Sequence, residues 1–153
     1  MRNVLGRMAR ATRNFSARWA SDVLDRLRKR SEAEGISKSR LAERYVDEGI
    51  RMDEHPGIEF RDGPAGRRAA LQRGPDVWQL VMAMKEYESN GGDLIAATAE
   101  NLNLAVSQVE AGVRYYGAYP EDIDERITAN TEGSAEVEAV WLRDQAASRE
   151  AAA

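Results

Sequence analysis

The first regular pattern of hydrophobic and polar residues in this chain is RNFSARW, residues 13–19. Polar and apolar residues alternate there, which is typical of a β-strand with one buried and one solvated face. The preceding residues, 1–12, contain no candidate partner strand and are predicted to form a basic, flexible arm. The predicted strand therefore has no obvious partner in its own part of the sequence.

The pattern then changes to a period near 3.6, which predicts two helices, over residues 22–34 and about 38–52. Ser21 and Ser37 are the predicted N-caps, and Gly35 is expected to end the first helix. The apolar faces of the two helices consist of Val23, Leu24 and Leu27, and of Leu41, Ala42, Tyr45, Val46 and Ile50.

From His55 onward the sequence is rich in glycine and proline and predicts a β-hairpin, with strands at residues 58–61 and 67–71. Three helical patterns follow, then a helix that opens at Pro120 and a last helix after Gly133. The predicted fold class is mainly α with short β. Its predicted segments are a basic arm (1–12), a strand with two helices (13–52), a hairpin with helices (55–130), and a C-terminal helix and tail (133–153).

Composition narrows the possible chemistry. The absence of cysteine excludes disulfides and thiolate metal sites, and a single histidine excludes a histidine cluster within one chain. No nucleophile and base can be paired, so we expect neither an enzyme nor a cofactor. No apolar run is long enough to span a membrane, and the N-terminus lacks the apolar core of a secretory signal. We therefore expect a cytoplasmic protein without membrane association.

Charge is divided unevenly along the chain. Residues 1–52 contain 13 Lys and Arg against 7 Asp and Glu, a net charge of +6, whereas the remaining residues contain 9 basic and 19 acidic side chains, a net charge of −10. A basic head on an acidic body predicts a polyanionic partner for the first segment only.

A strand and two helices in about 40 residues expose too much apolar surface to fold alone, and a second copy would cover that surface. The stretch NFSARWASDVLDRLRKRSEAEGISKSR resembles the ribbon-helix-helix family of bacterial repressors in its aromatic residue, arginine and tryptophan, its VLD helix start, and its glycine and serine between helices. The resemblance covers residues 13–52 and implies an intertwined homodimer. The expected shared core consists of Phe15, Ala17, Trp19, Leu24, Leu27, Ala42 and Val46.

The resemblance also implies that the polar face of the paired strands enters the major groove of double-stranded operator DNA. Arg18 can bond guanine through two acceptors, Asn14 matches an adenine edge, and Ser16 is short enough for close approach. Phosphate contacts are expected from Arg2, Arg7, Arg10 and Arg13 and from the second helix start at Ser37, Lys38 and Ser39. The alternative is an edge strand of an unrelated sheet, with arginines that only add solubility.

Residues 55–130 resemble a small domain found in bacterial antitoxins, through HPGI, FRDGPAGRRA, DVW and the YY and YP pairs near its end. The resemblance implies a winged helix-turn-helix-like arrangement. Residues 99–113 fit the motif locally, with Ala99 where helices cross, Asn103 in a left-handed turn and Val109 on the inner face.

Charge argues against DNA binding by this second segment, because residues 75–118 contain two basic and six acidic side chains. Its second motif helix is expected to expose Ser107, Gln108, Glu110, Ala111 and Arg114. Protein interaction or structural support is the expected role.

Three arginines, Arg61, Arg67 and Arg68, flank the DGPAG turn of the hairpin. Two interpretations remain open: they enter an acidic pocket of a partner, or they pair with neighbouring acids. His55 beside Asp53 and Glu54 lacks the convergence that a metal site needs, so no metal is expected.

Together these features predict an antitoxin of a type II toxin–antitoxin system, which represses its own operon through the ribbon and neutralises a toxin through its acidic C-terminal part. By resemblance, the toxin is expected to be a PIN-like ribonuclease, whose acidic metal site an arginine can occupy. Val137, Val140 and Trp141 are candidate partner contacts, although Trp141 could equally pack as core against Val113 and Tyr116. The alternative function is a stand-alone ribbon-helix-helix transcriptional regulator.

Overall fold

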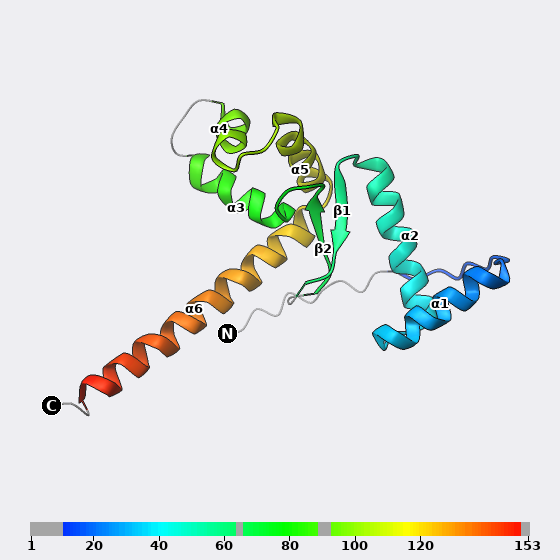
Figure 1. The fold of residues 1–153 in the computed structure, drawn as a ribbon, viewed down its shortest axis with the longest axis horizontal. Coiled ribbons are helices and arrows are strands. Elements are labelled where there is room, and N and C mark those ends of the chain that lie inside the picture. Colours follow the sequence, from blue (N-terminus) through cyan, green and yellow to red (C-terminus); the bar gives the residue numbers. More distant parts are fainter. Residues whose placement is uncertain (1–10, 64–65, 89–92, 151–153) are drawn as a thin grey trace. The chain divides into compact units, whose positions relative to one another are not determined.

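The structure is a computed structural model that describes residues 11–63, 66–88 and 93–150, with the side chains of residues 138 and 141–150 left out. The described part is mainly helical, with six helices and one two-stranded antiparallel sheet (Figure 1). This confirms the predicted class of mainly α with short β. The chain divides into two compact units, residues 1–45 and 46–153, and the division falls inside the second helix rather than after it.

The first unit contains helix α1 (Ser21–Glu34) and the start of helix α2 (Lys38–Glu54). Gly35 ends α1 as predicted, in a left-handed conformation with φ of 66°. Ser37 caps α2 as predicted, because its hydroxyl accepts a hydrogen bond of 3.2 Å from the Arg40 backbone N–H. The prediction for Ser21 was wrong: it is the first helical residue, since the carbonyl of Ala20 already accepts from Leu24 N–H.

The second unit begins with the last turns of α2 and continues into the hairpin. Strands β1 (Ile58–Arg61) and β2 (Arg68–Leu71) pair antiparallel, with Ile58 opposite Leu71. The predicted hairpin is confirmed, although the second strand is one residue shorter than expected. Helices α3 (Val77–Tyr87), α4 (Leu94–Asn101) and α5 (Val106–Ala118) follow at the predicted places.

The core of the second unit lies where α3 packs against α4, α5, α6 and β2. Each helix contributes apolar residues from one face, because one face of an amphipathic helix must be buried. The buried core consists of Ile58, Ala69, Leu71, Val77, Leu80, Val81, Ala99, Val109, Tyr115 and Ile123.

The connection between α4 and α5 has the geometry expected of a helix-turn-helix turn. Asn103 has a φ of 53°, the left-handed conformation predicted for it, and Leu104 N–H donates a 2.8 Å bond to the carbonyl of Ala99. Asp93 caps α4 by accepting from Ile95 and Ala96 N–H groups at 3.1 and 3.2 Å. Ala99 and Val109 are buried, as expected for the residues where these helices meet.

Helix α6 (Pro120–Glu150) is a single long helix that leaves the contact with α3 and α5 and continues well past them (Figure 1). Pro120 opens it as predicted. The predicted break at residues 131–133, which would have separated a last helix, was wrong. One glycine inside a helix costs only about 1 kcal/mol relative to alanine, which is too little to end a helix by itself.

Two glycines of α5 test how tightly the second unit is packed. A Cβ at Gly112 would lie 2.3 Å from Leu80 Cδ2, whereas a Cβ at Gly117 would meet nothing within 4 Å. We expect Gly112→Ala to lower the free energy of unfolding by about 1–3 kcal/mol, because the core must shift to admit the methyl group. Gly117→Ala should leave it unchanged or raise it slightly. Denaturant unfolding of both variants checks this, and equal stability would contradict the packing of α5 on Leu80.

Candidate functional site

The predicted DNA-reading residues, Asn14, Ser16 and Arg18, are all exposed in the structure. They lie in a segment, residues 11–20, to which the structure assigns no strand. A two-stranded ribbon needs hydrogen bonds from a second strand, and the residues that the structure describes supply none to this segment. The ribbon therefore stays a prediction, and its polar side chains are accessible.

The predicted dimer core is not closed within one chain. Phe15 is 89% exposed, and Trp19, Leu24 and Val46 are also exposed. Of the other predicted core residues, Ala17 is exposed while Leu27 and Ala42 are half-buried. Large apolar side chains exposed at this density form a candidate binding surface.

The predicted phosphate contacts divide into described and undescribed residues. Arg13, Ser37, Lys38 and Ser39 are exposed. Arg2, Arg7 and Arg10 lie outside the described residues. The start of α2 thus offers a helix N-terminus with an accessible cation, which is the arrangement that phosphate groups bind.

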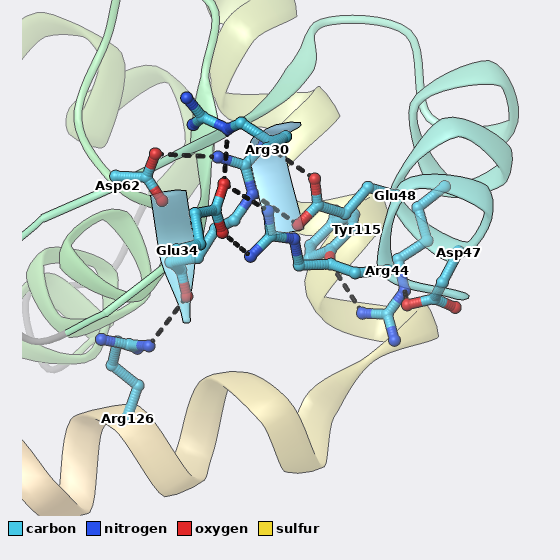
Figure 2. Close-up of polar contacts among 10 residues, drawn as sticks. Arg30, Glu34, Arg44, Asp47, Glu48, Asp62, Tyr115 and Arg126 are labelled. Atoms are coloured by element: carbon cyan, nitrogen blue, oxygen red, sulfur yellow. Dashed lines mark hydrogen bonds and ion pairs between the residues drawn. The ribbon is translucent and has the colours of Figure 1, made fainter. Parts of the chain in front are cut away.

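Within the first unit, Glu34 at the end of α1 lies between two arginines (Figure 2). Arg30 Nε is 2.6 Å from its Oε1, and Arg44 of α2 is 2.8 Å from its Oε2. The hydrogen bond from Arg44 is the main cause of a lowered pKa for the Glu34 carboxyl. This pairing joins the two helices of the predicted DNA-binding segment across the turn at Gly35.

The three hairpin arginines form ion pairs within the chain, and their assignment as partner contacts stays a prediction. Arg61 binds Glu59 at 2.6 Å and donates to the backbone carbonyls of Leu71 and Gly74. Arg68 pairs with the buried Asp76 at the entry to α3. In the structure each of the three arginines pairs with a carboxylate of the same chain, which is the second of the two interpretations.

Arg67 makes the most extensive of these contacts. Its Nε and Nη2 donate to the two carboxylate oxygens of Glu48 at 2.6 and 2.8 Å, and Asp62 lies 3.3 Å from Nη1. Figure 2 shows Asp62 and Glu48, and shows Arg126 of α6, whose Nη2 donates to the Arg67 carbonyl at 3.1 Å. The hydrogen bond to Glu48 raises the pKa of the Arg67 guanidinium, so this charge is permanent.

Arg51, one turn after Glu48, is buried at the end of α2. Its guanidinium donates to the Tyr115 hydroxyl at 3.1 Å and to Asp122 at 2.8 Å, and it lies 4.0 Å from the centre of the Tyr119 ring. Burial alone would lower the pKa of Arg51, but the hydrogen bonds to Asp122 and Tyr115 outweigh it, so the net shift is upward. Burial is also the main reason that the pKa of Tyr115 is raised.

His55, the single histidine, takes part in the same cluster as an aromatic ring. It meets Tyr115 and Tyr119 edge-on, with ring centres 5.4 and 5.7 Å apart. Among the described residues no group of His, Asp and Glu is arranged to hold a metal ion. No helix in the same part of the chain is long and apolar enough to cross a membrane.

Comparisons with protein-family models, with curated proteins and with solved structures find no match to this chain.

Sequence reasoning did not find Glu48 and Arg51. It placed the boundary after Met52, but both side chains are buried within the second unit. The only available signal was two charged residues three positions apart on the helix face opposite Val46, which is also the pattern of an ordinary solvated face.

Helix α5, the second helix of the predicted helix-turn-helix, carries few side chains that could bind DNA. Ser107, Glu110 and Arg114 are exposed on α5, as expected. Ala111 is buried instead, and Gln108 is half-buried because its side chain bonds the carbonyl of Gln72 at 3.0 Å. This leaves one cation on that face, which is insufficient for a phosphate backbone.

The described part of α6 beyond the core is exposed. The side chains of residues 128–137 are all accessible, and Val137 is 70% exposed. Val140 is also exposed. Trp141 lies in α6, but its side chain is outside the described part of the chain, so the choice between an anchor and a core residue stays open.

The buried pair Glu48–Arg67 should be energetically coupled, whereas the exposed pair Asp22–Arg26 should not. We expect a double-mutant cycle with Glu48→Gln and Arg67→Gln to give a coupling free energy of about 1–3 kcal/mol. The same cycle on Asp22 and Arg26, which are about three-quarters exposed, should give under about 0.5 kcal/mol. Urea unfolding of the wild type and the six variants measures both values, and a negligible coupling for the first pair would contradict its role.

Proposed function

We propose that this protein is a dimeric ribbon-helix-helix antitoxin, which binds operator DNA through residues 13–52 and a toxin protein through its C-terminal helix. The observation that carries the proposal is the row of exposed apolar side chains from Phe15 to Val46, which alternates over residues 13–19 with exposed polar side chains. The apolar face is suited to packing against another molecule, and the polar face is suited to hydrogen bonding with the edge of a DNA base.

A second copy is the cover that fits this segment. Two RNFSARW strands paired antiparallel satisfy each other's backbone groups and place Phe15, Ala17 and Trp19 on one face, over the helices. Asn14, Ser16 and Arg18 then form the opposite face of the ribbon. A two-stranded ribbon fits the major groove, where these side chains can read bases.

Charge supports the same assignment. The net charge of +6 over residues 1–52 favours a polyanion, and the exposed start of α2 offers N–H groups and Lys38 to a phosphate. The remaining residues, with a net charge of −10, would repel DNA and are free for a different partner.

We assign the toxin contact to α6 rather than to the hairpin. Arg61, Arg67 and Arg68 already have carboxylate partners, so an acidic toxin pocket would have to displace those partners before it could bind them. The exposed part of α6 carries Val137 and Val140 among acidic residues. A helix with an apolar anchor and acidic flanks suits a groove with basic edges on the partner.

The competing function is a stand-alone transcriptional regulator, which shares the DNA-binding half of the proposal. The internal pairing of the hairpin arginines favours the regulator in one respect, because paired arginines are less available to contact a toxin. A neighbouring gene whose product binds this chain would exclude it.

Base readout and phosphate binding should be separable in the full-length protein. We expect Arg18→Ala to cost about 1–3 kcal/mol on the operator and to reduce discrimination against random DNA, because it removes a base contact. Lys38→Ala should weaken binding to the operator and to random DNA about equally. It should also reduce the slope of log affinity against log salt concentration by the amount expected for about one phosphate contact. Salt titrations on an operator selected from random DNA measure both effects. Identical behaviour of the two variants would remove Arg18 from base recognition.

Toxin binding should depend on the exposed part of α6. We expect Val137→Glu to weaken binding of the neighbouring gene product by about 2 kcal/mol, because a charge would enter the contact. Its melting temperature should be unchanged, since Val137 is 70% exposed. Val106→Glu, at an exposed position on α5, is the matched control and should bind normally. Full binding by a chain that lacks residues 131–150 would refute the assignment.

A further inference from the structure

Helix α6 is divided into an anchored base and an exposed remainder. In its first two turns Ile123 is buried and Ile127 packs against the core of the second unit. Every side chain from residue 128 to residue 137 is exposed. The direction of the exposed part therefore depends on how the first two turns are held.

Two polar contacts hold one side of this base. Arg51 near the end of α2 donates a 2.8 Å hydrogen bond to Asp122. One turn later, Arg126 donates at 3.1 Å to the backbone carbonyl of Arg67, the residue before strand β2. Asp122 and Arg126 are four residues apart, so they lie on the same side of α6. This side is thus tied both to α2 and to the hairpin.

Asp124 holds the opposite side of the base. Its carboxylate accepts a 2.9 Å hydrogen bond from the Tyr116 hydroxyl of α5 and lies 3.4 Å from Lys85 Nζ of α3. Successive residues are about 100° apart around a helix, which places Asp124 about 200° from Asp122. The polar contacts therefore flank the apolar stripe of Ile123 and Ile127 on both sides.

Contacts on both sides of an apolar stripe restrict a helix more than the stripe alone does. Two isoleucines one turn apart let α6 rock on the core, because hydrophobic contact is non-directional. Hydrogen bonds depend on both distance and angle, so these contacts together define one orientation of the helix. Rotation of α6 in either sense would lengthen the bonds on one side or the other.

The anchored base also supplies a nucleus for the helix of the exposed part. Forming the first turn is the costly step of helix formation, whereas each later residue adds one hydrogen bond. Residues 128–134 include two threonines, an asparagine, a glycine and a serine, which are weak helix formers. A segment of this composition is marginal as an isolated helix, so its order depends on the turns at its base.

We propose that Asp122, Asp124 and Arg126 are positioning residues, which fix the direction of the exposed part of α6 and so preorganise it for a protein partner. The use of this arrangement in binding rests on the proposed function. A partner then meets a helix that is already ordered, and less conformational entropy is lost on binding. The affinity depends in part on contacts that the partner does not touch.

Because the chain has no cysteine, two introduced thiols can carry spin labels that report the distance between α5 and α6. We would label a Val106→Cys, Val137→Cys chain at these two exposed positions, dilute it with unlabelled chain, and measure the distance distribution by pulsed electron spin resonance. Asp124→Asn should widen this distribution about twofold, because one side of the base is released. Glu125→Gln, at an exposed carboxylate in the same turn, is the matched control and should leave the width unchanged.

Two further variants keep the test decisive. Asp122→Asn should also widen the distribution, and Tyr116→Phe, which retains the ring and loses only the hydroxyl, should do so to a smaller extent. Circular dichroism and thermal melting establish which variants are folded. If Asp122→Asn does not fold because the buried Arg51 loses a carboxylate, the half-exposed Asp124 decides the matter. An unchanged width in a folded Asp124→Asn chain would overturn the positioning role.

Binding kinetics with the neighbouring gene product test the use of this arrangement. Asp124→Asn should lower the association rate constant about three- to tenfold and leave the dissociation rate constant unchanged, because fewer free chains hold the helix in the competent direction. Faster dissociation would instead make Asp124 a direct contact and overturn its positioning role. If the unmodified chain does not bind this product, the toxin half of the proposed function and this use of the helix both fail, whereas the spin-label widths still decide whether the base fixes the helix.

Discussion

The two charged side chains buried on helix α2 are the constraint on which the rest of this structure depends. Glu48 holds the hairpin through Arg67, and Arg51 holds the start of α6 and the end of α5 through Asp122 and Tyr115. Buried ion pairs contribute little net stability compared with apolar packing, but removing one partner costs about 3–5 kcal/mol. Such pairs therefore define which face of a helix points inward more strictly than apolar contacts do.

This constraint explains why the second half of α2 exposes apolar side chains. With Glu48 and Arg51 turned inward, the aliphatic side of α2 must face solvent or a partner. The same helix begins at a capped, basic N-terminus that is accessible to phosphate. A single helix thus carries an exposed, basic N-terminus at one end, and over its second half it exposes aliphatic side chains on one side and buries charged side chains on the other.

The arginines of the second unit have a structural use that their position in the sequence conceals. Arg61 and Arg68 stabilise the connection from β2 to α3. Arg61 donates to the carbonyls of Leu71 and Gly74, and Arg68 pairs with Asp76. With these charges paired internally, the second unit is left with an excess of acidic side chains, a surface that repels polyanions. Residues 128–137 of α6 are exposed, and an exposed helix of this kind is only marginally stable alone in water.

The sequence by itself determined the local structure. The hairpin and the core faces of α3, α4 and α5 follow from periodicity, and Gly35, Ser37 and Asn103 adopt the conformations that their positions required. These features depend on residues within one or two turns of each other, so a pattern suffices to predict them. The end of α6 was misjudged because one glycine is a weak local signal that a continuous helix can absorb. The tertiary structure alone decided which charges are buried. Glu48 pairs with Arg67, 19 residues later in the sequence, and Arg51 pairs with Asp122, 71 residues later. The sequence pattern is the same for a charged helix residue that faces water and for one that is buried against a distant partner. The pattern gives the spacing of the residue along the helix but not what packs against it.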